Sequence, residues 1–147
     1  MSAFAARLAA TCPATVSTIA TTCTGSAGPL VLEARSLPWV GSTYRWNGTG
    51  FAANSFAATV VGSTSPGIPL SALDPGGLPN CFLLASVDEL WLATPAGGIV
   101  AATAVIPRDP AFFGLQVYQQ LLQAEFSAGG AVSFSSSNAL RLTIGVF

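Results

Sequence analysis

The chain has very little charge. Only 7% of its 147 residues are charged, lysine and histidine are both absent, and the net charge is −1. A typical soluble domain carries roughly 25% charged residues. Nucleic-acid binding needs a basic stripe that five scattered arginines cannot form, and disorder needs the reverse of this 51% hydrophobic composition. Without histidine, Ser–His and Cys–His catalytic pairs and imidazole metal sites are excluded as well.

A long apolar run is also missing. The longest uncharged stretch, residues 46–73, contains two prolines, four glycines and several Ser, Thr and Asn residues. Because a membrane-spanning helix needs about 20 predominantly apolar residues, we predict no membrane span.

Carboxylates are too few and too scattered to indicate chemistry. Carboxylate-based acid/base catalysis uses two groups about 5–9.5 Å apart, and Asp88, Glu89 and Asp109 are the candidates. Asp88 and Asp109 fall in turn sequences, where Asp commonly accepts hydrogen bonds from backbone N–H groups. A calcium site that added Asp74 lacks the usual ligand spacing. We therefore predict a non-enzyme with no catalytic residue, no metal and no cofactor.

Three cysteines leave one without a partner. Cys12, Cys23 and Cys81 form no CxxC motif, and a zinc site is disfavoured without histidine. In an oxidising compartment one pair would form a disulfide, and in the cytosol all three would be buried thiols. Closing the loop from Cys23 to Cys81 would stabilise the fold by roughly 4 kcal/mol in the chain-entropy model.

Strand and turn patterns predict an all-β fold. Residues 1–28 form a low-complexity lead that we interpret as an extended N-terminal arm, and residues 29–147 form the domain. Residues 113–126 fit either a helix or a long strand, and their alternation favours the strand. About eight short strands at spacings of 8–14 residues, joined by Gly and Pro turns, indicate an antiparallel β-sandwich of jelly-roll or immunoglobulin-like type. The expected strands are 30–35, 42–47, 56–61, 81–85, 89–93, 99–106, 113–126, 131–134 and 140–144.

Three aromatic residues are candidates for a ligand platform. Tyr44 and Trp46 are two residues apart, so they lie on one face of a strand. Together with Trp91 they would provide rings on which sugars stack. The alternative is that they pack in the core of the sandwich, which we favour.

The order of several motifs resembles a β-rich domain found at the C-terminal end of large exported proteins of Planctomycetes and related bacteria. The matching text covers roughly five-sixths of the chain and includes CTGS (23–26), LPWVGSTY (37–44), GIPL (67–70), LPNCFLLASVD (78–88), IPRDP (106–110), GLQVYQQ (114–120) and SNALRLTIG (137–145). The resemblance implies a non-catalytic accessory module with a disulfide between Cys23 and Cys81, which leaves Cys12 free. The chain departs from that family in standing alone with its own N-terminal extension.

The shortage of charge favours self-assembly. Sheet edges are normally protected by Lys, inward-pointing charges or Pro, whereas this chain has no Lys. We expect an extracellular or cell-surface structural protein that forms a filament, tube or surface layer with itself through strand addition and apolar contacts. Leu8, Val16 and Ile19 of the uncharged arm are the expected contact residues. The alternatives are an extracellular carbohydrate-binding module that uses the aromatic platform on polysaccharide, and a monomeric domain of Ala-rich composition.

Overall fold

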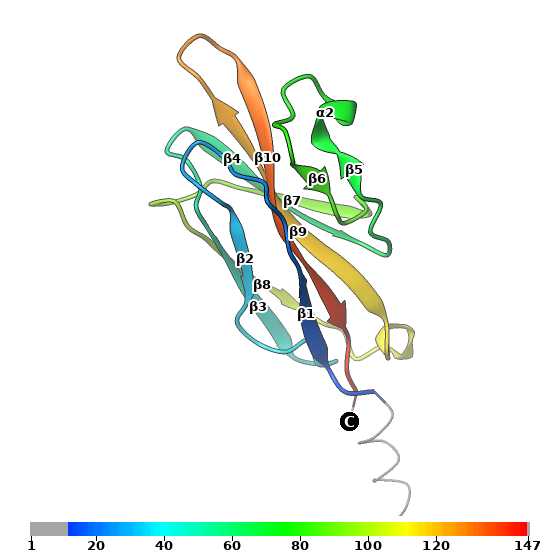
Figure 1. Ribbon diagram of the computed structural model, residues 1–147. Coiled ribbons are helices and arrows are strands. Elements are labelled where there is room, and N and C mark those ends of the chain that lie inside the picture. The colour runs from blue at the N-terminus through cyan, green and yellow to red at the C-terminus, as the bar shows by residue number, and fades with distance from the viewer. Residues whose placement is uncertain (1–11, 147) are drawn as a thin grey trace, which may run out of the picture.

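The computed structural model describes residues 12–146, which form a β-sandwich (Figure 1). One sheet has five strands in the order β1-β10-β9-β4-β7, and the other has three in the order β2-β3-β8. Neighbouring strands pair antiparallel throughout. The predicted all-β antiparallel sandwich is therefore confirmed.

The connection from β1 to β2 has eleven residues, and all other connections have eight or fewer. Their bounds are β1 (Thr15–Ile19), β2 (Val31–Ala34), β3 (Thr43–Thr49), β4 (Ser55–Gly62), β5 (Ile68–Pro69), α2 (Leu70–Leu73), β6 (Phe82–Leu83), β7 (Glu89–Ala93), β8 (Val100–Val105), a 3-10 turn (Pro110–Phe112), β9 (Gln116–Phe126) and β10 (Val132–Thr143).

Strand β3 shows how alternation positions the core. Tyr44 and Trp46 point into the sandwich and are buried, whereas Thr43 and Arg45 point outward. Gly48 is the next inward position, and a Cβ atom there would overlap the side chain of Leu121 on the opposite sheet. A glycine is therefore required for the two sheets to approach at this point.

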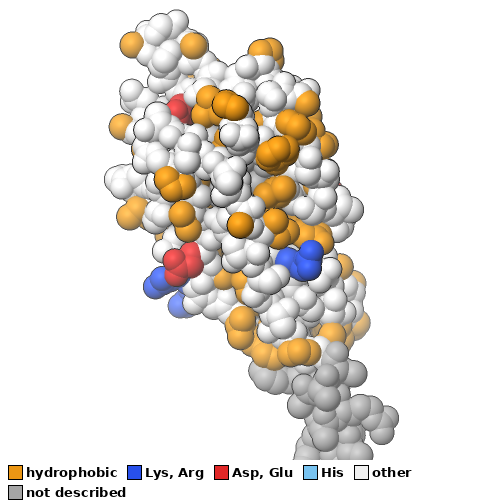
Figure 2. Space-filling model, viewed as in Figure 1, with side chains coloured by type: hydrophobic (Ala, Val, Ile, Leu, Met, Phe, Trp, Pro, Cys, Tyr) orange, Lys and Arg blue, Asp and Glu red, His pale blue; other side chains and the backbone are white. Residues whose placement is uncertain are grey.

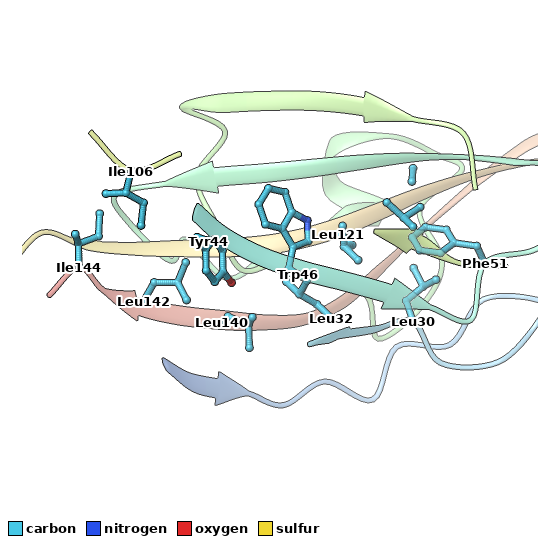
Figure 3. Close-up of a cluster of buried hydrophobic side chains, with 12 residues drawn as sticks. Leu30, Leu32, Tyr44, Trp46, Phe51, Ile106, Leu121, Leu140, Leu142 and Ile144 are labelled. Atoms are coloured by element: carbon cyan, nitrogen blue, oxygen red, sulfur yellow. The ribbon is translucent and has the colours of Figure 1, made fainter. Parts of the chain in front are cut away.

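The main core lies between the two sheets. Figure 3 shows Tyr44 and Trp46 of β3 facing side chains from β9 and β10 of the larger sheet. Its buried members are Leu30, Leu32, Tyr44, Trp46, Phe51, Ala57, Val100, Ile106, Leu121, Leu140, Leu142 and Ile144. Tyr44 and Trp46 therefore pack in the core of the sandwich, which was the favoured prediction for them.

The two long C-terminal strands differ from expectation in extent. Residues 116–126 form the predicted strand, and the helix alternative is wrong. Residues 132–143 form one strand, β10, instead of two short ones, because a register shift between Ser136 and Ala139 lets the pairing with β9 continue past the irregular segment. Residues 63–80, for which no strand is predicted, contain β5 and α2.

The N-terminal arm packs on its own chain where it is described. Thr15–Ile19 form β1, which pairs with β10 at the edge of the larger sheet, so this part of the arm belongs to the sandwich. Val16 is half-buried and packs against the core. Strand propensity explains the difference, since TVSTI is rich in β-branched residues despite the low-complexity text around it. Leu8 lies outside the described residues.

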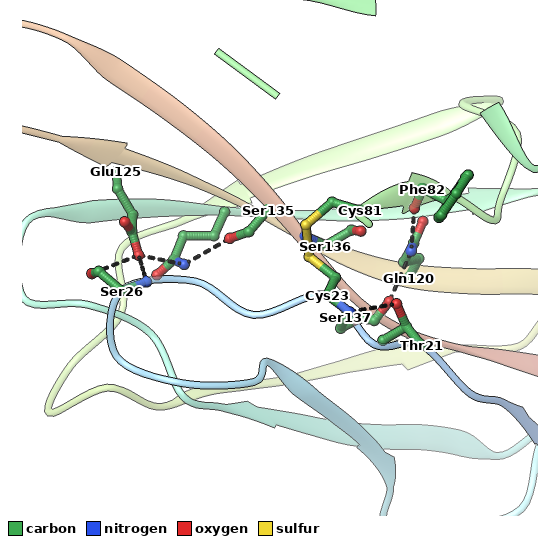
Figure 4. Close-up of a disulfide and its surroundings, with 11 residues drawn as sticks. Thr21, Cys23, Ser26, Cys81, Phe82, Gln120, Glu125, Ser135, Ser136 and Ser137 are labelled. Atoms are coloured by element: carbon green, nitrogen blue, oxygen red, sulfur yellow. Dashed lines mark hydrogen bonds between the residues drawn. A yellow bond between two sulfur atoms is a disulfide. The ribbon is translucent and has the colours of Figure 1, made fainter. Parts of the chain in front are cut away.

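A disulfide attaches a small flap to the outer face of the larger sheet. Cys23 and Cys81 are bonded, with their Cα atoms 4.6 Å apart, which confirms the pairing implied by the resemblance (Figure 4). The flap consists of β5, α2 and β6, and its Leu70 and Leu83 pack with Leu122 of β9. Disulfides persist in oxidising compartments.

None of the helices in residues 12–146 is long and apolar enough to cross a membrane.

Candidate functional site

One side of the sandwich is bonded from sheet to sheet. The Asn138 side chain of β10 accepts a hydrogen bond from the Leu32 backbone N–H at 2.8 Å and donates one to the Leu32 carbonyl oxygen at 3.0 Å. These two bonds satisfy the backbone N–H and carbonyl groups of Leu32 on the edge strand β2, as pairing with a neighbouring strand would. We call the side formed by β1 and β2 the bonded side.

The opposite side, formed by β7 and β8, has no such connection. Strand β7 ends the five-stranded sheet and β8 ends the three-stranded sheet, and within residues 12–146 neither has a second partner strand. The two strands are joined by a tight turn that contains the Ala96–Ile99 bridge, but they do not pair with each other. We call this the open side.

The open side is apolar and almost uncharged. In β7, Leu90, Trp91 and Leu92 are exposed in succession, with Leu92 74% accessible, and Glu89 is the only charged residue of either strand. In β8, Val105 is also 74% accessible. Neither strand contains Lys, Arg or Pro, which are the residues that usually keep a free edge from pairing. Over the face drawn in Figure 2, too, charged side chains are confined to a few small patches.

An apolar cleft of about 480 Å³ opens between the sheets on this side. A smaller space of about 210 Å³ shares Trp46, Trp91 and Ala104 with it. Apolar side chains from both sheets and from the 3-10 turn line the cleft, among them Ile106, Phe112, Leu115, Val117, Leu142 and Ile144. Its volume falls within the ~300–1,000 Å³ usual for small-molecule sites.

The three aromatic candidates meet at this cleft but do not form a surface platform. The Tyr44 and Trp46 rings are stacked with centroids 5.3 Å apart, and Trp91 lies 6.2 Å from Trp46. Tyr44 and Trp46 are only 4% and 3% exposed, because β3 turns them toward the core, whereas Trp91 on the edge strand is 43% exposed. Trp91 alone offers a ring face to solvent.

Three polar groups lie among these apolar side chains: the Tyr44 hydroxyl, the Gln119 amide and the Trp46 indole N–H. The Tyr44 hydroxyl donates to Gln119 Oε1 at 2.8 Å, and burial raises the pKa of Tyr44 far above its ordinary value, so the hydroxyl stays protonated. Gln119 Nε2 and Trp46 Nε1 are buried, and neither has a hydrogen-bond partner among the described residues. Both side chains line the cleft.

Sequence reasoning missed Gln119 and Asn138. The available signal was a polar residue on the apolar face of an alternating strand, since Gln119 lies between Val117 and Leu121 on the inner face of β9. Neighbouring Gln120 on the other face is fully bonded, accepting from the Leu84 N–H and donating to the Phe82 and Ser137 carbonyl oxygens. Gln120 thus uses both ends of its amide in hydrogen bonds, whereas Nε2 of Gln119 has no partner among the described residues.

Three carboxylates that were candidates for catalysis or calcium binding accept hydrogen bonds from backbone N–H groups. Asp88 Oδ2 accepts from the Ser63 N–H at 2.8 Å, and Asp109 Oδ1 accepts from the Ala111 N–H at 2.9 Å at the start of the 3-10 turn. Asp74 accepts from the Gly76 N–H in the same manner. The turn-capping prediction is confirmed for Asp88 and Asp109, and residues 12–146 hold no group of three or more potential metal ligands.

Comparisons with known proteins yield no relative: no family model matches the chain, and no curated protein or solved structure is similar to it.

Proposed function

We propose that this chain is a non-enzymatic structural protein that assembles with copies of itself through the β7 edge of the open side. The observation that carries the proposal is the run Leu90–Trp91–Leu92, three large apolar side chains exposed in a row on a strand with a free edge. Strand addition to such an edge would satisfy its backbone groups. It would also place side chains of the added strand beside Leu90 and Leu92 on one face of the sheet and beside Trp91 on the other.

The surroundings of β7 support the same role. The strand contains one charge, Glu89, at its first position, so a second copy of the strand laid antiparallel would place Glu89 opposite Ala93 and oppose no like charges. Phe56, exposed on the outer face of the adjacent strand β4, adds apolar surface beside the edge. The disulfide supports placing the protein in an oxidising, extracellular setting.

The arm has a different part in this proposal from the one first expected. Val16 and Ile19 belong to β1, whose pairing with β10 of the same chain uses one edge of that strand and leaves the other free. Within β1, contacts with another copy would therefore use the free edge of the strand. The open side supplies the larger apolar area.

The test is the oligomeric state of the full chain and of an edge variant. Sedimentation velocity over a wide concentration range, with negative-stain imaging of the largest species, should show association of the native chain. Leu92→Lys should reduce association at least tenfold, because it places a like charge at the edge of both copies. Leu73→Lys, which replaces an exposed leucine of α2 away from the open side, is the control and should associate like the native chain. A native chain that stays monomeric at high concentration contradicts the proposal.

Carbohydrate binding is the competing function, and Trp91 is the residue that favours it. Retention of the chain on a polysaccharide affinity gel, lost in Trp91→Ala, would support that function instead. Because Tyr44 and Trp46 are buried, only one ring of the three is available for stacking, and a single exposed tryptophan is a smaller surface than the assembly edge.

A further inference from the structure

We infer that the cleft between the sheets binds a small uncharged amphiphile, a molecule with an apolar body and an oxygen that accepts hydrogen bonds. The inference does not rest on the proposed assembly function, although the two share Trp91 of β7. It rests on the shape and lining of the cleft and on two buried N–H groups that have no partner in residues 12–146.

The walls select an apolar body. The cleft of about 480 Å³ is lined mainly by aliphatic and aromatic side chains from both sheets. Trp91 lies at the exposed edge and Trp46 at the buried end, so a chain-like molecule would run along the rings from solvent toward the core. Because β7 and β8 are not paired with each other, the cleft can widen without the loss of a strand ladder.

The polar groups select an oxygen acceptor. Gln119 Nε2 and Trp46 Nε1 are both donors, and Gln119 Oε1 is already occupied by the Tyr44 hydroxyl. A buried donor without a partner is unfavourable, so a ligand oxygen that accepts from either group would be bound more tightly than a hydrocarbon of the same size. An ammonium group, which is a donor only, would leave both N–H groups unsatisfied.

The charges that line the cleft disfavour an anion. Asp88 and Glu89 line it, and no Arg of the described chain does. A carboxylate ligand would meet these two acidic side chains with no cation to offset them. The ligand chemistry that satisfies all three conditions is therefore a neutral alcohol or ester on an alkyl chain.

A series of probes with one chain length and different head groups tests this inference. Binding of 1-decanol, decanoate and decylammonium to the full native chain is measured by tryptophan emission and by calorimetry, at a protein concentration where sedimentation shows a single species. Decanol should bind at least tenfold more tightly than either ion. Equal binding of all three, or no binding of decanol, would overturn the inference, since it would indicate adsorption on exposed apolar surface or no site.

Variants of residues that line the cleft then test whether the probe binds there. Gln119→Leu should weaken decanol binding about three- to tenfold, the loss expected for one hydrogen bond, whereas Gln116→Leu, exposed on the same strand, should leave it unchanged. If Gln119→Leu does not fold, Ala104→Phe on the edge strand β8 provides a second test. Ala104 lines the cleft opposite Tyr44, so the larger side chain would fill part of the cleft while Gln119 and Trp46 are retained. Native affinity in a folded Ala104→Phe protein would contradict the site.

Discussion

Edge strands of both sheets form each of the two long sides of the sandwich, but the sheets are connected by hydrogen bonds on only one of these sides. On the bonded side, Asn138 holds Leu32 of β2 as a neighbouring strand would, and β1 covers β10. On the open side, β7 and β8 lie over an apolar cleft and have no connection except their turn. The difference indicates that one side supports the fold and the other is available for contacts. Substitutions on the bonded side should therefore change stability, and those on the open side should change association.

Loss of the disulfide should have the largest effect on stability. It closes a loop of 58 residues and attaches the flap beside β10. In the chain-entropy model its removal in Cys23→Ala/Cys81→Ala costs about 4 kcal/mol of unfolding free energy. Urea denaturation of the double variant measures this cost, and Cys12→Ala, the free cysteine, is the control that should change little. A double variant as stable as the native chain would show that the disulfide does not stabilise the fold.

Breaking the link between the sheets should come next. Asn138→Ala leaves the Leu32 N–H and carbonyl without their partner, so we expect a loss of about 2–3 kcal/mol. Asn54→Ala, an exposed asparagine before β4, should cost much less. Equilibrium denaturation of the two variants side by side gives the comparison. If both lose the same small amount, Asn138 does not hold the bonded side together.

The buried hydroxyl at the cleft makes a smaller, pH-dependent contribution. Burial raises the pKa of Tyr44 above its ordinary value of 10.0, so the folded chain keeps this proton after the unfolded chain has lost it. The contribution of Tyr44 to stability is therefore complete below pH 10 and falls at higher pH, by at most about 1.4 kcal/mol per pH unit. Denaturation at pH 9, 10 and 11 should show this decrease, and Tyr44→Phe should make the dependence shallower. An identical pH dependence in both proteins would contradict the assignment.

Substitutions on the open side should leave stability nearly unchanged. Val105→Lys, on the free edge of β8, is expected to alter the free energy of unfolding by less than about 0.5 kcal/mol because the side chain is already exposed. The same variant should weaken self-association if β8 contributes to the contact. Denaturation and sedimentation of one preparation separate these two readouts. A large loss of stability would mean that the open side also supports the fold.

The fold class and most strands were predictable, and the reasons lie in local patterns. Alternation around Tyr44 and Trp46 predicts β3 with both rings inward, and the Gly and Pro turns separate the strands that follow. The strand at Thr15–Ile19 was missed, because its pairing with Leu142 and neighbouring residues of β10 is a contact across almost the whole chain. The β-branched run TVSTI favours a strand locally, but nothing near it in the sequence shows that β10 is its partner.

The aromatic residues of the candidate site were predictable, but its form and its polar residue Gln119 were not. Tyr44, Trp46 and Trp91 meet as expected, yet their burial depends on which sheet covers them, and alternation within one strand does not reveal that. Gln119 was not found, because a glutamine in an alternating strand is ordinarily assigned to the solvent face. Only the placement of β9 between a core and a flap shows that both of its faces are covered.

The strand count of the larger sheet has a consequence for any polymer that grows from it. Five strands, each antiparallel to the next, make β1 and β7 run in the same direction. Copies stacked by simple translation would therefore join β7 to β1 in parallel, whereas antiparallel joints require two-fold axes that alternate between β7–β7 and β1–β1 contacts. A filament of the second kind has two identical ends and grows at equal rates from both.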